Sequence, residues 1–212
     1  MKAPNPSLWL LPALIIMASV YALAADQESC VKLANQKLDK VTITSAVFMN
    51  DPQGFALPQT PGMFGTPPGQ KTTAQFCRVV GYIEPVKNSH IGFEVWLPPA
   101  EKWNNRYFGV GNPAFEGAIK YQGLKLAVEK GYATASTDTG HEDPGHKWAT
   151  GQPERLIDWA HRAVHETTVV AKELIKAFYG RAQKYAYWDS CHNGGRHGLT
   201  KLNSIPKIST GL

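Results

Sequence analysis

Residues 185–199 limit the possible folds of this chain more than any other stretch. Residues 185–189 (YAYWD) are mostly aromatic and apolar, which is typical of a strand in a sheet. Residues 190–195 (SCHNGG) form a turn closed by two glycines, and RHGL, which follows, can begin a helix. A strand that passes through a tight turn directly into a helix is typical of alternating α/β proteins.

The rest of the chain alternates in the same way. Apolar periodicity predicts strands at 41–48, 76–83, 91–98, 106–112, 132–138 and 186–189, and helices at 30–40, 118–130 and 158–179. Gly131 and Gly180 stand where the second and third of these helices should end. Residues 51–70 are rich in Pro and Gly and should form an irregular loop. We therefore expect an antiparallel hairpin at 76–98, followed by a parallel α/β sheet with right-handed crossovers.

The N-terminus reads as a secretory signal peptide. Lys2 precedes an apolar run at 8–18, and Ala22-Leu23-Ala24 has the small-residue pattern of a cleavage site. The alternative is an uncleaved membrane anchor, but the run is short and contains Pro12. We expect residues 1–24 to be removed, which leaves 25–212 as a secreted or periplasmic protein that is not anchored in a membrane.

Charge and cysteine content restrict partners and redox chemistry. The formal charge of +5, or +4 without Lys2, is spread along the chain, so we expect no nucleic-acid partner. Three cysteines in an exported protein allow one disulfide. We predict that Cys30 pairs with Cys77 and that Cys191 has no partner.

The turn at 190–194 can be compared with the G-x-S-x-G nucleophile elbow of α/β-hydrolases. Serine replaces the first glycine, and His192 stands at the serine position. Several other segments, in order, resemble the tannase and feruloyl esterase family: CRV and GYI at 77–83, FEVWLP at 93–98, WNNRYFGVGN at 103–112, GYATASTDTGH at 131–141 and AFYG at 177–180. Together with the elbow, this ordered series identifies the chain as a member of that family.

The resemblance implies an α/β-hydrolase-type, mostly parallel sheet with flanking helices, and an exported serine esterase that cleaves small-molecule phenolic acid esters, without a cofactor or a metal. Family members carry a lid domain that contacts the aromatic acid, and their acid and histidine follow the elbow. The elbow serine is preceded by a cysteine that bonds a later cysteine, and Cys191 matches this position. The resemblance also places the oxyanion hole at the backbone N–H of Asn193 and at Gly111 or Asn112, because Pro113 has no N–H.

The departures from the family pattern, at position 192 and after Leu199, predict little or no esterase activity. A triad cannot form without the serine at position 192, and no Asp, His or Cys follows Leu199. We therefore expect an N-terminal fragment of the catalytic domain that ends after the elbow helix and lacks the lid and the C-terminal half. A change of reading frame near Thr200 or Lys201, in the gene or in its determined sequence, is our hypothesis for this ending.

Other functions remain open at this point. The chain could be a non-catalytic binding protein that kept the hydrolase pocket, or a pseudogene product. His161 and His165 have metal-ligand spacing, although a core helix with no third ligand explains them better. His141, Glu142, Asp143 and His146 could line an active site or simply be a solvated loop. By resemblance, Asp138 belongs to the pocket floor rather than to the triad.

Overall fold

A computed structural model describes residues 10–60, 62, 64–143 and 145–204 of the chain. Its strands are β1 (Val41–Met49), β2 (Phe55–Ala56), β3 (Lys71–Thr72), β4 (Phe76–Ile83), β5 (Ile91–Leu97), β6 (Arg106–Val110), β7 (Ala133–Thr137) and β8 (Tyr185–Asp189). The α-helices are α1 (Leu10–Leu33), α2 (Tyr121–Glu129), α3 (Pro153–Ile157), α4 (Ala163–Tyr179) and α5 (Asn193–Ser204). A 3₁₀ turn η2 (Lys147–Ala149) and a π-helical turn η3 (Asp158–Arg162) complete the elements.

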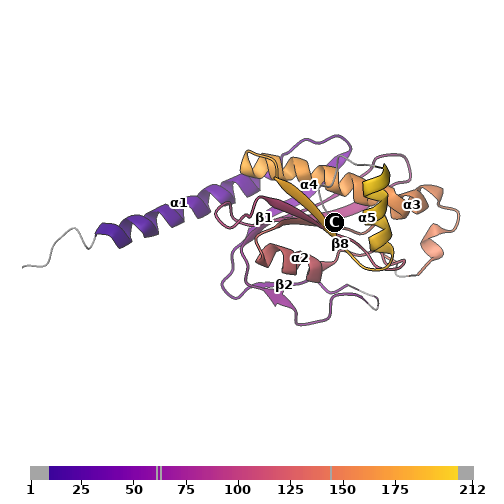
Figure 1. Ribbon diagram of the computed structural model, residues 1–212, viewed down its shortest axis with the longest axis horizontal. Coiled ribbons are helices and arrows are strands. Elements are labelled where there is room, and N and C mark those ends of the chain that lie inside the picture. Colours follow the sequence, from indigo (N-terminus) through magenta and orange to yellow (C-terminus); the bar gives the residue numbers. More distant parts are fainter. Residues whose placement is uncertain (1–9, 61, 63, 144, 205–212) are drawn as a thin grey trace, which may run out of the picture.

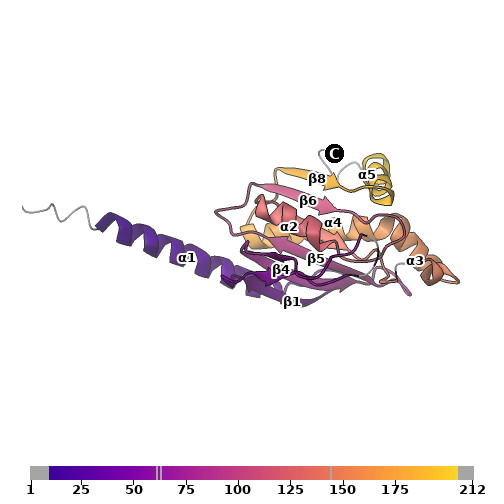
Figure 2. The ribbon, with the colours of Figure 1, turned by 90° about the horizontal axis from the view of Figure 1, so that it is seen from below.

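Six strands form one mixed sheet in the order β1-β4-β5-β7-β6-β8 (Figures 1 and 2). The strands β1, β4, β5 and β7 pair antiparallel, which confirms the expected hairpin at 76–98. The strands β7, β6 and β8 pair parallel. The C-terminal ends of these three strands therefore meet at one edge of the sheet, which is where functional loops gather in α/β proteins.

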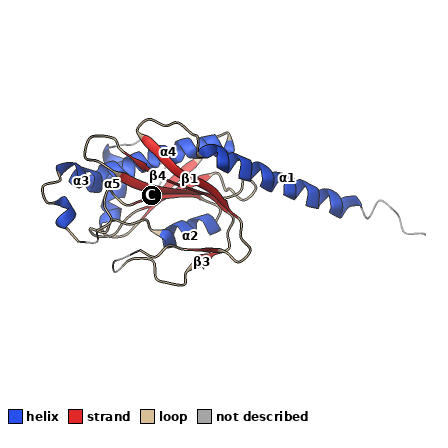
Figure 3. Cartoon of the chain, turned by 180° about the vertical axis from the view of Figure 1, so that it is seen from behind, coloured by secondary structure: helices blue, strands red, loops and turns tan. Residues whose placement is uncertain are grey.

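The sheet is covered by helices on both faces (Figure 3). On one face, α1 and α4 bury Leu33, Leu174 and Ile175 in a core that continues into β4, β5 and β7. On the other face, Leu124 and Val128 of α2 pack with Trp96 in a smaller core. Both faces of β5 are thus buried, which accounts for its nearly continuous apolar sequence.

The disulfide between Cys30 and Cys77 is present, as predicted, and it joins α1 to β4. It fixes the C-terminal end of α1 to the body, and the N-terminal part of α1 projects away from the sheet (Figure 1). Asp26 lies at the start of this docked part, and its carboxylate accepts a hydrogen bond from the N–H of Ala100. None of the helices in the described residues is long and apolar enough to span a membrane.

Helix boundaries differ most from expectation near the N-terminus. The helix predicted at 30–40 is instead the end of α1, which stops at Leu33 and continues as a hydrogen-bonded turn. Lys40 then takes a positive φ of 58°, which a helix cannot contain. The start of the proposed signal peptide, residues 1–9, lies outside the described residues, and α1 runs without a break past Ala24.

Two later helices differ in detail from the predictions. The segment predicted as helix from 118 begins as α2 only at Tyr121, and Gly131 ends it with a φ of 77°. The helix predicted at 158–179 opens with the π-turn η3 and becomes regular at Ala163. Asp158 in this turn is fully buried, where Ser89 donates to its carboxylate and Arg162 forms an ion pair with it. The ion pair has the i, i+4 spacing of a helix, whereas Ser89 lies 69 residues away, so the helical period alone does not reveal the Ser89 contact.

Candidate active site

The turn between β8 and α5 has the geometry of a nucleophile elbow. The strand β8 ends at Asp189 and α5 begins at Asn193, so three residues connect them. His192 has a φ of 51°, in the left-handed region that non-glycine residues rarely occupy. Such strain is common where a structure holds a functional side chain in a fixed position. Position 192 is therefore presented at the edge where the parallel strands end.

Close packing under the turn explains its small residues. A Cβ added at Gly194 would collide with the side chain of Ser190 and lie 3.0 Å from the carbonyl oxygen of Asn112. A Cβ at Gly111 would meet Ser190 in the same way. The indole of Trp188 stabilises the turn, since its N–H donates to the carbonyl oxygen of Gly194 at 2.9 Å. Ser190 thus fills the space between two glycines that no side chain could enter.

The side chains at the turn face solvent. His192 is exposed, and its ring centre lies 5.8 Å from that of Phe64. Cys191 is exposed and is not in a disulfide in this structure. Asn193 is half-buried, and its side-chain oxygen accepts from the guanidinium of Arg196 at 2.7 Å. Among the described residues, no carboxylate forms a hydrogen bond or an ion pair with His192.

The three residues expected to form the oxyanion hole lie around the turn, and they differ in whether their N–H groups or side chains are already hydrogen-bonded. The N–H of Gly111 donates to the carbonyl oxygen of Asp189 at 3.1 Å, so this donor is already engaged. The side chain of Asn112 is buried and donates to the carbonyl oxygens of Ala118 and Thr137, which fixes the loop after β6. Asn193 is the first residue of α5, so its N–H has no acceptor within the helix.

A cavity of about 280 Å³ adjoins the turn. The side chains of Phe64, Lys120 and Gln122 line it, together with Asp189, Ser190 and Cys191. It lies between the end of β8, the start of α2 and the loop that carries Phe64. Sequence inspection did not single out Phe64 or Lys120, because neither belongs to a motif.

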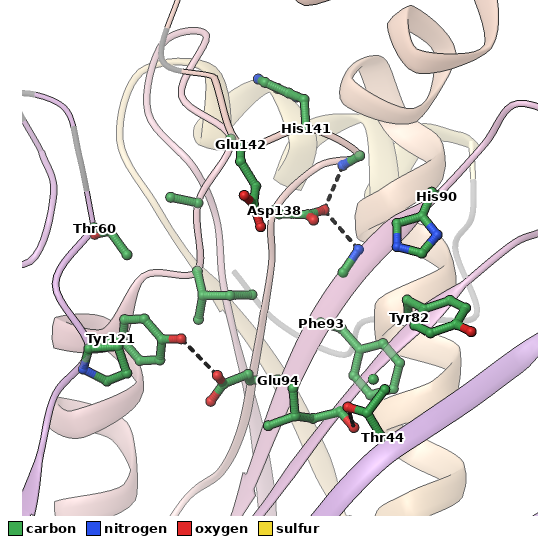
Figure 4. Close-up of a pocket in the computed structure, with 18 of the residues that line it drawn as sticks. Thr44, Thr60, Tyr82, His90, Phe93, Glu94, Tyr121, Asp138, His141 and Glu142 are labelled. Carbon is green, nitrogen blue, oxygen red and sulfur yellow. Dashed lines mark hydrogen bonds between the residues drawn. The ribbon is translucent and has the colours of Figure 1, made fainter.

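A larger cavity, of about 760 Å³, lies beside β4 and β5 near the C-terminal end of β7 (Figure 4). Asp138 is on its wall, and its Oδ1 accepts from the N–H groups of Gly92 and Gly140 at 2.9 and 2.7 Å. Burial raises the pKa of Asp138 to about 7, although the two backbone N–H groups oppose this effect. The nearby carboxylates of Glu142 and Asp158 raise it further.

A buried polar network forms another wall of this cavity. Glu94 is 3% exposed and binds both Nε and Nη2 of Arg78. The same carboxylate accepts from the indole N–H of Trp96 at 2.9 Å. It also accepts from the hydroxyl of Tyr121 at 2.7 Å (Figure 4). A buried carboxylate needs this many donors to offset the loss of water. The network therefore locks β4, β5 and α2 together.

The polar cluster at 141–146 separates in the structure. His141 is buried, stacks on Trp148 at 3.8 Å, and lies with its Nε2 2.8 Å from the carbonyl oxygen of Phe115. Burial lowers the pKa of His141, so the neutral ring that donates from Nε2 is favoured. Glu142, Asp143 and His146 are exposed. Only His141 therefore belongs to the packed region near the site, as a support for the loop after β6.

The histidine pair at 161 and 165 lies where η3 passes into α4. His161 is exposed and His165 is half-buried. Within the described part of the chain, no group of three His, Cys, Asp or Glu side chains is placed to hold a metal ion. The pair therefore gains no third ligand from the fold described here.

Comparisons with known proteins agree with this geometry. The family model described as tannase and feruloyl esterase matches residues 77–209. An uncharacterised esterase of Xanthomonas campestris pv. campestris is 35% identical over 96% of the chain and 34% of its own length. Feruloyl esterase B of Aspergillus niger is 31% identical over 90% of the chain and 37% of its own length.

Solved structures give the same result. The crystal structure of feruloyl esterase B from Aspergillus oryzae superposes with a TM-score of 0.77 and 27% identity, over 87% of this chain and 36% of that one. An esterase from Aspergillus oryzae gives a TM-score of 0.77 at 28% identity, over 86% and 36%. The chain thus spans roughly a third of the length of these relatives, and the expected α/β-hydrolase-type fold is confirmed. The chain belongs to the tannase and feruloyl esterase family.

Proposed function

We propose that this chain is the elbow-bearing part of an ester hydrolase for phenolic acid esters, and that in the form described here it hydrolyses them little or not at all. The observation that carries the proposal is His192 at a φ of 51° in the turn between β8 and α5. Family membership supports the reaction class. The residue at position 192 supports the expected loss of activity.

The chemistry of acyl transfer explains the expected inactivity. Ester hydrolysis by this fold needs a hydroxyl that a neighbouring histidine deprotonates and that forms a hydrolysable acyl-enzyme. The imidazole of His192 is larger than a hydroxymethyl group, and no carboxylate in the described part of the chain orients it. Loss of a triad member costs several orders of magnitude in rate and leaves only the contribution of the oxyanion donors and of binding. The N–H of Asn193 is a candidate for that remaining donor, with Asn112 beside it, whereas Gly111 is engaged with Asp189.

Acylation by an activated ester tests this proposal directly. In a Cys191→Ala background, which removes the neighbouring exposed thiol, the chain is mixed with 4-nitrophenyl ferulate with and without His192→Ser. We expect no excess 4-nitrophenolate with histidine at 192, and slow release with a feruloyl adduct on the elbow peptide after His192→Ser. The matched control, Ser204→Ala with His192 retained, should behave like the parent. Turnover by the parent chain, or the absence of any adduct after His192→Ser in a folded protein, would contradict the proposal.

The second candidate is a non-catalytic binding protein, and the 760 Å³ cavity beside Asp138 favours it. Titration calorimetry with methyl ferulate measures binding without requiring chemistry. Saturable binding by the parent chain together with no acylation after His192→Ser would favour this candidate. If the chain showed no cooperative thermal transition, it would not be stably folded, and we would describe it as a pseudogene product.

We also propose that the chain is exported, to the periplasm or to the medium. The disulfide between Cys30 and Cys77 supports this location, because such bonds persist in oxidising compartments. Cell fractionation followed by N-terminal sequencing tests it, and we expect a mature N-terminus near Ala25 or Asp26. Recovery of the chain in the reduced cytoplasm with Met1 intact would contradict the assignment.

A further inference from the structure

Phe64 lies beside the elbow although it is far from it in the sequence. Its side chain is 41% exposed, which is high for a phenylalanine, and its ring centre is 5.8 Å from that of His192. The same side chain lines the 280 Å³ cavity that Ser190 and Cys191 close from the other side. An exposed aromatic ring that borders a cavity is an available surface for stacking or edge contact with another ring.

A buried ion pair holds the backbone of Phe64 in this place. Glu116 and Lys120, in the loop that leads into α2, are 6% and 8% exposed, and the Nζ of Lys120 lies 2.6 Å from Oε2 of Glu116. The other carboxylate oxygen of Glu116 accepts from the N–H of Phe64 at 3.2 Å. The ammonium of Lys120 donates to the carbonyl oxygen of Phe64 at 3.4 Å. A buried pair that binds both backbone groups of one residue fixes that residue more firmly than an exposed loop would.

The lining of the cavity suits a small ring with polar substituents. Phe64 and Val110 offer apolar surface, while Gln122 and Asp189 are exposed polar side chains on the same lining. A volume of about 280 Å³ holds one substituted ring and is too small for a longer chain of sugars. The cavity is therefore matched to a phenol rather than to an oligosaccharide.

We infer that this cavity holds the aromatic ring of the ester, with Phe64 as its wall and Glu116 and Lys120 as the residues that position Phe64. This inference rests on the proposed function, since it assigns a place to the phenolic group of that substrate. Unlike the proposed function, the inference about the cavity concerns only binding, so it can be tested without any reaction at position 192.

Protection of Cys191 supplies a local readout. Cys191 lines the cavity, and it is the one cysteine outside the disulfide among the three in the sequence. Methyl ferulate bound in the cavity should slow alkylation of this thiol by iodoacetamide, whereas methyl hexanoate at the same concentration should not. The concentration dependence of the protection gives a Kd for methyl ferulate.

Variants of Phe64 then test the wall. Phe64→Ala should weaken protection by methyl ferulate about five- to tenfold, which is the contribution of a good aromatic contact. Phe64→Tyr should retain the affinity, and Phe64→Leu should lose the preference for the aromatic ester. The matched control is Val169→Ala on α4, which is also 41% exposed but lies on the other face of the sheet, and it should leave the Kd unchanged. Glu116→Gln should also weaken binding, because it loosens the position of Phe64. In the Phe64→Ala background, the same substitution should change the Kd little.

Three results would overturn the inference: an unchanged Kd after Phe64→Ala, binding of methyl ferulate by calorimetry without protection of Cys191, or no methyl ferulate binding at all. Failure of the proposed reaction is distinguishable from these results. A chain that protects Cys191 but forms no adduct after His192→Ser keeps the inference and loses the reaction. A chain that forms the adduct without protecting Cys191 does the reverse.

Discussion

Asp138 should make the folded chain less stable as the pH rises from about 4 to about 7. In the folded state its pKa is raised to about 7, mainly by burial, whereas an unfolded aspartate titrates near 3.8. Between these values the folded chain keeps a proton that the unfolded chain has released, so a rise in pH favours unfolding. The loss of folding stability caused by Asp138 is absent below about pH 4 and complete above about pH 7. A shift of about 3 units corresponds to at most about 4 kcal/mol.

The substitution Asp138→Asn isolates this effect. Asparagine keeps the Oδ1 that accepts from Gly92 and Gly140 but carries no titrating proton. Urea unfolding followed by tryptophan fluorescence at pH 5, 6, 7 and 8 gives the free energy of unfolding for both chains. Because part of the effect is already present at pH 5, we expect the stability of the variant relative to the parent to rise by about 2–3 kcal/mol between pH 5 and pH 8. Other groups, including His141, contribute equally to both chains and cancel in the difference.

The control is Asp143→Asn. Asp143 is exposed and also accepts from a backbone N–H, that of Gly145 at 2.7 Å. This variant should follow the parent at every pH. If Asp138→Asn also ran parallel to the parent from pH 5 to pH 8, the raised pKa of Asp138 and its cause would both be refuted.

Two further predictions concern stability. Replacing Cys30 and Cys77 together by alanine should lower the free energy of unfolding by about 4 kcal/mol in the chain-entropy treatment, given their separation of 47 residues, and a loss below about 1 kcal/mol in urea unfolding would contradict it. Gly194→Ala should lower the melting temperature through overpacking worth about 1–3 kcal/mol, because the new methyl group collides with Ser190. Adding Ser190→Gly should recover part of this loss in calorimetry, and an unaltered melting temperature for Gly194→Ala would show that the turn is looser than described.

Local patterns were sufficient to predict the elements that surround the elbow. The aromatic run at 185–189 is β8, and Gly131 and Gly180 end α2 and α4 with positive φ. These features depend on neighbours within one turn or one strand. The disulfide could be predicted because the expectation of export, together with only three cysteines, left few choices.

Contacts between distant residues could not be predicted in this way. Glu94 meets Arg78 and Tyr121, 16 and 27 residues away, and nothing in the local sequence selects these partners. The contact of Glu116 with Phe64 spans 52 residues. The π-turn η3 also involves a contact between distant residues, since Ser89, 69 residues away, donates to Asp158. A single sequence shows which residues suit a helix or a strand, but side chains meet according to the three-dimensional packing of the sheet.

The hypothesis of a changed reading frame near Thr200 or Lys201 stays a prediction. The helix α5 continues to Ser204, and the family match continues to residue 209. Determination of the nucleotide sequence on both sides of codon 200 tests it. Downstream codons that do not encode a hydrolase in any frame would contradict it.

The disulfide also closes a covalent ring in the chain. Cys30 and Cys77 join the two ends of a segment that contains β1, β2, β3 and Phe64. A protease that cuts an exposed bond anywhere inside this ring opens the chain without separating its pieces. The cut protein would remain a single species on a gel without reductant and would divide in two after reduction. The covalent link from α1 to β4 would thus outlast a break in the loop that brings Phe64 to the elbow.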